Sequence, residues 1–258
     1  LGSWLNIIWP FGFAYLLSQY RIKFKMFIIS IFLASLASSI LLSASRAAWL
    51  CLFLSIILFF IRLTKKWFII YFIGIISLYL LTSNSFIFES INHFLYKNLQ
   101  VELLDNFSKE TYINDISRID IWGIGINNIF ERPIWGHGAS SFPKYIYEIT
   151  GAWKGHAHNL PIELIYSYGL PAGILILVPF FSVLFIAARN IFLMKRYKMY
   201  DYIFDKAIII SLLLLAFYHL FDMTYFDGRI SITGWIMFAA IKNISRETND
   251  RFKLKEND

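Results

Sequence analysis

The chain has 258 residues, of which 58% are hydrophobic and only 16% are charged, and its formal net charge is +7 at pH 7. The apolar residues form long blocks, which excludes an ordinary soluble domain and predicts an all-α integral membrane protein. The single cysteine, Cys51, excludes an intramolecular disulfide, and the basic residues form no patch typical of a nucleic-acid partner.

Seven apolar runs approach the roughly 20 residues that cross a bilayer. Four fall within residues 1–82 and three within residues 160–241. In chain order they are Leu1–Leu17, Met26–Ala44, Ala47–Leu63, Trp67–Thr82, Leu160–Ala187, Ala207–Phe221 and Ile230–Ile241. The chain begins with Leu, and its first run lacks the features of a signal peptide, so we expect earlier helices before it.

Lys and Arg predict the side of the membrane on which each connection lies. Sixteen of the 24 basic residues fall in the connections 18–25, 62–66 and 188–206 or in the charged tail 242–258, which we assign to the cytoplasm. The alternate connections, including the large loop 83–159, then face the periplasm of a bacterium. We therefore expect a multi-pass protein of the bacterial inner membrane, surrounded by membrane lipids.

The large loop has apolar residues at helical spacing in "SINHFLYKNLQVELLDNF" (90–107) and in "SRIDIWGIGINNIFERPIW" (117–135). This pattern predicts short amphipathic helices on the membrane surface. A turn-rich connection follows, marked by Pro133, Gly136, Gly138 and Pro143. The fifth span should be kinked or broken, because it contains Gly169, Pro171, Gly173 and Pro179.

Three arginines fall on the predicted periplasmic face: Arg46 at a tight turn, Arg118 between Asp115 and Asp120, and Arg229 beside Asp222 and Asp227. A guanidinium group stays charged and binds phosphate through two parallel hydrogen bonds. Simpler alternatives remain open, namely contact with lipid phosphate for Arg46 and local ion pairs for Arg118 and Arg229.

Two histidines, His156 and His158, stand just before the fifth span. Pro161 predicts that a helix begins near Asn159, because proline is tolerated in a first turn. A neutral imidazole is favoured beside the positive end of a helix, which suits His158 as a general base. Glu163 lies four residues after Asn159, on the same helical face, so we expect a structural hydrogen-bonded pair.

A metal site is the alternative use of these histidines. His137, Asp222 or Glu163 would have to supply a third ligand, and no further ligand occurs at the spacings of zinc sites. We therefore expect no metal.

Several stretches carry a resemblance to a known family: "SRAAW", "SRIDIW", "ERPIWGHGASSF" and "HAHNLPIELIYSYGLPAG". They resemble the C-terminal portion of the O-antigen ligase and polymerase superfamily of membrane glycosyltransferases, over nearly the whole chain. Its pattern of His-Asn, nine residues and Gly is met by His158, Asn159 and Gly169. The second glycine of the pattern is Ala172 here, with Gly173 one place later. "FDMTYFDGR" is similar to ligase-like members.

The resemblance implies transfer of a glycan from undecaprenyl diphosphate to a hydroxyl of a lipid A core or similar acceptor, at the periplasmic face. Guanidinium groups can stabilise the leaving diphosphate without a metal, and displacement by a hydroxyl that His158 deprotonates predicts inversion at the sugar C1. We expect no cofactor. We assign His158 as the base and Arg46, Arg118 and Arg229 as diphosphate ligands. The expected supporting residues are His156, Asn159, Glu163, Asp222 and Asp227.

Other functions share these features. A polymerase of repeat units uses the same donor chemistry, and protein O-glycosylation belongs to the same superfamily. A transporter of lipid-linked glycans would use the arginines and the kinked helix as a path. The sequence shows no paired discontinuous segments of the kind found in inverted-repeat transporters, which disfavours transport. "FDMTYFDGR" favours ligase over polymerase.

Overall fold

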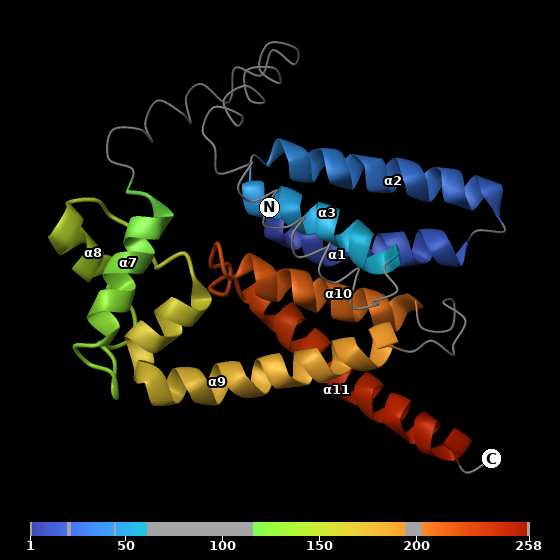
Figure 1. Ribbon diagram of the computed structural model, residues 1–258. Helices are drawn as coiled ribbons and strands as arrows, with labels where there is room; N and C mark the ends of the chain where they lie inside the picture. The colour runs from blue at the N-terminus through green and yellow to red at the C-terminus, as the bar shows by residue number, and fades with distance from the viewer. Residues whose placement is uncertain (1, 20–21, 44, 61–115, 194–202, 257–258) are drawn as a thin grey trace, which may run out of the picture.

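The computed structural model describes residues 2–19, 22–43, 45–60, 116–193 and 203–256. Within these ranges the chain forms α-helices and no β-strand, which confirms the all-α prediction for this part (Figure 1). The helices are α1 (Gly2–Ser18), α2 (Lys23–Leu42), α3 (Arg46–Phe60), α7 (Arg118–Ile129), α8 (Phe142–Thr150), α9 (Leu160–Leu193), α10 (Ile203–Tyr218) and α11 (Gly228–Glu256).

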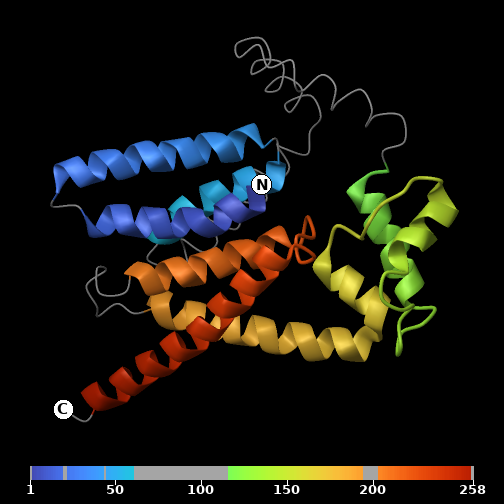
Figure 2. The same cartoon turned by 180° about the vertical axis from the view of Figure 1, so that it is seen from behind.

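Buried side chains form three clusters. The first joins α1, α2, α3 and α10 through residues such as Ile40, Phe59 and Leu214, and the second joins α9, α10 and α11. The third lies between α7, α8 and the start of α9, where Ile121 and Tyr166 are almost fully buried. The loop segment therefore has a core of its own, at one end of the long helices (Figures 1 and 2).

Two of the described helices are long and apolar enough to cross a membrane, over Lys23–Leu42 and Leu160–Arg189. Only 11% and 17% of their most apolar windows are buried, whereas the core helix of a soluble protein would be mostly buried. Their exposed apolar faces suit contact with lipid. The seven predicted spans are not all confirmed: Ala47–Phe59 is a shorter apolar helix, and the predicted span 67–82 lies outside the described residues.

The predicted break in α9 is confirmed at Gly169, whose φ of 84° and ψ of 166° interrupt the helix. The loop 133–138 satisfies the backbone groups around the break. It does so through His137 N–H to Tyr166 O (2.9 Å), Gly138 N–H to Ser167 O (3.0 Å), and Leu170 N–H to Pro133 O (2.7 Å). A Cβ at position 169 would lie 2.1 Å from Ile134 O, so this contact requires glycine.

The helical prediction for residues 117–135 is confirmed by α7, and the one for residues 90–107 lies outside the described residues. Two expectations need correction. Helix α8 occupies part of the expected turn-rich connection, and Pro143 lies in its first turn, where proline breaks no hydrogen bond. Helix α11 continues to Glu256 through most of the predicted separate tail, whose Arg, Glu and Lys residues are good helix formers.

Three segments that are distant in sequence meet at one end of the long helices. The loop between α10 and α11 turns toward α7 and α8, and the start of α9 lies beside it (Figures 1 and 2). Residues 118, 156–163 and 218–223, which are distant in sequence, therefore come together.

Candidate active site

Asn159 fixes the start of α9 against the end of α10. Its side-chain oxygen accepts from Ile162 N–H (3.1 Å), as an N-cap residue does, and its amide nitrogen donates to Leu220 O (3.0 Å). Leu160 N–H donates to His219 O (2.9 Å). The backbone donors of this first turn are thus already engaged, so the helix end offers none of them to an anionic ligand.

The Glu163 side chain fixes the backbone of the segment that carries His156 and His158. Its buried carboxylate accepts from Ala157 N–H (2.9 Å) and from the Ser167 hydroxyl (3.4 Å). The expected side-chain pair between Glu163 and Asn159 is not formed, because each side chain bonds elsewhere. The role of Glu163 is nevertheless structural, since its carboxylate fixes Ala157, the residue between the two histidines.

His158 and Asp222 form the central contact. His158 Nδ1 lies 3.1 Å from Asp222 Oδ1, and the two side chains are 23% and 28% exposed. Burial alone would raise the pKa of Asp222, but the hydrogen bond from His158, nearby positive charge and the Met223 N–H together lower it. The carboxylate is therefore ionised and can only accept, so Nδ1 carries the proton. No hydrogen bond in the described part of the chain engages His158 Nε2.

The backbone of His158 is unusual, with φ at 52° in the left-handed region. A non-glycine residue there costs on the order of 1–3 kcal/mol, and such residues cluster at functional sites. The contacts of Asn159 and Glu163 on either side hold this conformation.

His156 adopts the opposite tautomer. His158 N–H donates to His156 Nδ1 (3.1 Å), so a neutral His156 ring carries its proton on Nε2. Burial lowers the pKa of His156, and the charges of His158 and Arg118 add to this effect, while Asp222 opposes it. The ring centroids of the two histidines are 4.3 Å apart. Two neighbouring imidazoles thus carry their protons on different ring nitrogens.

Arg118 reaches this cluster from α7. One of its five N–H donors bonds Phe221 O at 2.8 Å, next to Asp222 in the chain. Ser117 caps the helix through Asp120 N–H (3.2 Å), and its hydroxyl donates to the Asp120 carboxylate (2.6 Å). No ion pair between Arg118 and Asp120 is found, and Asp115, the other suggested partner, lies outside the described residues.

The other two arginines differ from this. Arg229 makes a two-point surface contact with Asp227, at 3.1 and 2.7 Å, and is 81% exposed, so the simpler alternative of a local salt bridge holds. Arg229 lowers the pKa of Asp227 to about 2. Arg46 is the first residue of α3, and its side chain is outside the described part. The Ser45 hydroxyl lies 3.4 Å from that of Tyr218, which places the start of α3 beside the end of α10.

One group of potential metal ligands occurs among the described residues: His156, His158 and Asp222, whose ligand atoms lie within 4.8 Å of one another. Of the three suggested third ligands, Asp222 is therefore the one in place. The Nδ1 atoms of both rings are already hydrogen-bonded, which leaves their Nε2 atoms as the nitrogens that could bind an ion, and the charge of Arg118 acts against a cation at His156. Direct hydrogen bonding accounts for the cluster without an ion.

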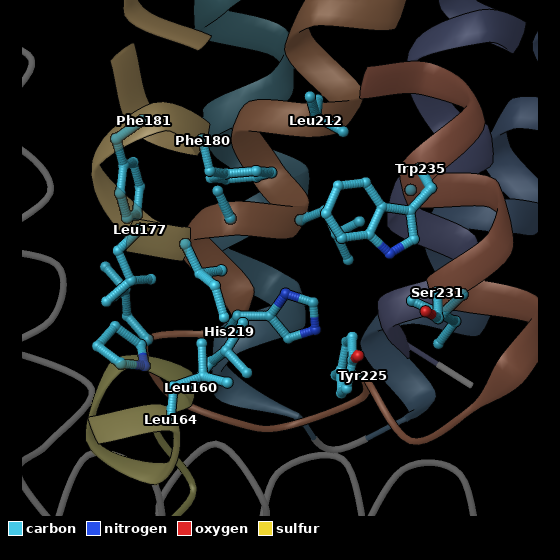
Figure 3. A pocket seen from close by; sticks show the side chains of 17 residues that line it. Leu160, Leu164, Leu177, Phe180, Phe181, Leu212, His219, Tyr225, Ser231 and Trp235 are labelled. Carbon is cyan, nitrogen blue, oxygen red and sulfur yellow. The ribbon is translucent and has the colours of Figure 1, made fainter. Parts of the chain in front are cut away.

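An apolar cavity of about 230 Å³ lies between α9, α10 and α11 (Figure 3). Leu177, Phe180 and Leu212 contribute to its apolar wall, and His219 and Tyr225 are among its few polar side chains. Leu160 and His219, which line it, are joined by a backbone hydrogen bond and are close in sequence to His158 and Asp222. The cavity therefore borders the polar cluster.

Sequence reasoning missed the backbone carbonyls of residues 219–221 and the aromatic rings around them. Trp122 of α7 packs against Phe221, with ring centroids 6.3 Å apart, and Phe226 lies 6.3 Å from His156. The resemblance of "FDMTYFDGR" to ligase-like members was the available signal for both phenylalanines.

A model of the O-antigen ligase family matches residues 30–177, which is more than half of the chain. The chain belongs to the O-antigen ligase family. The matched part holds Arg46, Arg118 and His158, while Asp222 lies beyond it. No curated protein and no solved structure matches the chain.

Membership confirms the resemblance noted from the motifs. It gives the chain a glycosyltransferase-like activity of the ligase or polymerase type, with lipid-linked glycans as the general substrate class, in lipopolysaccharide biosynthesis. It also makes the protein membrane-associated in bacteria, in agreement with its two long apolar helices.

Proposed function

We propose that this O-antigen ligase family member transfers a glycan from undecaprenyl diphosphate to an acceptor hydroxyl at the periplasmic face. The proposal rests on the 3.1 Å contact between His158 Nδ1 and Asp222 Oδ1. The carboxylate keeps the proton on Nδ1 and stabilises the positive charge that develops when Nε2 takes a second proton. This is the arrangement that a general base requires.

In the proposed reaction the acceptor oxygen attacks C1 of the donor sugar while its proton moves to His158 Nε2. The bond between C1 and the diphosphate oxygen breaks, and the diphosphate leaves with the bonding electron pair. Attack opposite the leaving group inverts the configuration at C1.

Arginine side chains stabilise the departing diphosphate in this proposal. Arg118 is anchored to Phe221 O by one donor, which leaves other N–H groups for phosphate oxygens. We assign Arg46 as a second ligand of the diphosphate because it is the first residue of α3. Arg229 is not assigned to the diphosphate, because Asp227 already accepts two hydrogen bonds from its guanidinium group. With two guanidinium groups, no metal or cofactor is needed.

The lipid tail would enter the apolar cavity between α9, α10 and α11. Its volume of about 230 Å³ suits only the part of a polyprenyl chain nearest the diphosphate. The sugars would then project beneath α7 and α8, where the loop segment has its own core.

The decisive experiment incubates the purified full-length protein with a defined lipid-diphosphate glycan and candidate acceptors, and identifies products by mass spectrometry. A single transferred block on the acceptor supports a ligase. A ladder of repeats on the lipid carrier would show a polymerase, which shares the donor chemistry. The absence of any covalent glycan product, with the donor still bound, would refute transfer and favour a transporter.

The periplasmic orientation has its own test. In a Cys51→Ala background, a cysteine at Ser141 should react with an impermeant thiol reagent in cells with a permeabilised outer membrane. A cysteine at Ser245 should react only after lysis, because the flanking basic residues place it in the cytoplasm. The opposite labelling pattern would put the proposed site on the wrong face.

A further inference from the structure

His156 has a hydrogen-bond donor that the transfer chemistry does not use. Its Nδ1 accepts from His158 N–H (3.1 Å), which leaves the proton of the neutral ring on Nε2. Within the described residues, no hydrogen bond engages this Nε2–H. The ring centroid lies 4.3 Å from that of His158, so the two imidazoles are direct neighbours.

An exposed aromatic surface lies next to the same ring. Phe226 is 6.3 Å from His156 between ring centroids, with an interplanar angle of 34°, and is 64% exposed. Tyr225, which is 43% exposed, packs edge-on against Phe226 at 5.9 Å. Phe226 does not line the apolar cavity, although its neighbour Tyr225 does.

A donor beside an exposed aromatic face matches one kind of ligand. A sugar ring has an apolar face of C–H groups, which packs on an aromatic ring, and hydroxyl groups at its edge, which accept hydrogen bonds. A serine or threonine hydroxyl of a protein acceptor has no such face and would leave Phe226 unused.

We infer that His156 and Phe226 form a subsite for the acceptor sugar, in which Phe226 stacks on the ring and His156 Nε2–H binds a hydroxyl beside the reacting one. This inference rests on the proposed function, because it places the acceptor next to His158. It adds that these two side chains position the acceptor sugar.

The test uses the purified full-length protein, a lipid-diphosphate-linked glycan and two kinds of acceptor probe. Octyl β-galactoside and octyl β-glucoside present a sugar, whereas N-octanoyl-serine methyl ester presents a hydroxyl without one. We expect at least one glycoside to exceed the serine ester in kcat/KM by about tenfold or more, the gain expected from one stacked ring or one hydrogen bond.

Substitutions then locate the effect. Phe226→Ala and His156→Ala should each raise KM for the preferred glycoside by about tenfold, with unchanged affinity for the donor. Phe226→Tyr keeps the ring and His156→Gln keeps an N–H donor, so both should retain most of the acceptor affinity. Phe226 is exposed, so its alanine variant should fold even if His156→Ala proves unstable.

The possible failures are distinguishable. Equal or better use of the serine ester, or glycoside KM values unchanged in folded Phe226→Ala and His156→Ala proteins, would overturn the subsite while leaving transfer intact. Transfer to neither kind of probe, with the donor still bound, would overturn the subsite and the proposed function together.

Discussion

The charge of Asp222 should contribute measurably to turnover through His158. In Asp222→Asn, an amide oxygen can take the place of Oδ1 and still accept from His158 Nδ1–H and Met223 N–H, so the geometry is preserved while the charge is lost. At 3.1 Å, the attraction between the carboxylate and an imidazolium is about 1.3 kcal/mol in water and about 5 kcal/mol at an effective dielectric constant of 20. Both side chains are roughly a quarter exposed, which favours an intermediate value of about 2–3 kcal/mol.

This value corresponds to a fall in kcat of about 30- to 150-fold. The lowered pKa of Asp222 means that its charge is complete above the ordinary carboxyl value of about 3.9 and is lost only as the pH falls below it. The wild-type protein therefore has this charge throughout the range from pH 5 to 8.

The assay is glycan transfer under single-turnover conditions, with donor affinity and thermal stability measured on the same preparations. Glu148→Gln is the matched control, because it removes a carboxylate from an exposed pair with Lys144 on α8. It should leave kcat within about twofold, as expected for a surface pair. An Asp222→Asn protein that folds normally and keeps wild-type kcat would show that Asp222 does not act on the base.

Three further predictions concern metal, donor binding and fold. Activity should survive exhaustive chelation, since guanidinium groups replace a cation. Loss of activity that one added metal restores would instead make His156, His158 and Asp222 a metal site. Turnover should fall by about two to four orders of magnitude in His158→Ala with donor affinity retained, whereas Arg118→Ala should also weaken donor binding and lysine there should rescue it only partly. Gly169→Ala should destabilise the fold by about 3 kcal/mol or more, because the position has a positive φ and its Cβ would meet a backbone carbonyl at 2.1 Å. Gly123→Ala, with open space around it, should stabilise the protein by about 0.5–1 kcal/mol in thermal unfolding.

Local signals in the sequence predicted much of the site. Pro161 and Asn159 located the start of α9, and Gly169 located its break, because each of these residues has a backbone requirement that the sequence displays directly. The Arg118 prediction placed a charged residue within reach of the cluster. These predictions needed only a residue and its immediate neighbours.

Predictions that depend on tertiary packing were less accurate. Glu163 was paired with Asn159 by helical spacing alone, yet its carboxylate bonds the backbone of Ala157, which the loop conformation brings close. The backbone groups freed by the break at Gly169 are satisfied by the loop 133–138, which the residues of the span itself do not indicate. Helical spacing cannot identify a partner that arrives from a different segment.

The end of α10 shows why the assembly of the site was hidden in the sequence. The last carbonyls of a helix have no partner within it, and the negative end of the helix dipole favours donors and cations there. Just past α10, the carbonyls of three consecutive residues, 219 to 221, each accept from a different group: Leu160 N–H, the Asn159 amide and the Arg118 guanidinium. A single helix end thus joins α7 and α9 and positions Asp222, the next residue, against His158. Backbone carbonyls are present whatever the side chain, so the residues that supply them carry no chemical signature, and only their donors, Arg118 and Asn159, can be recognised from the sequence.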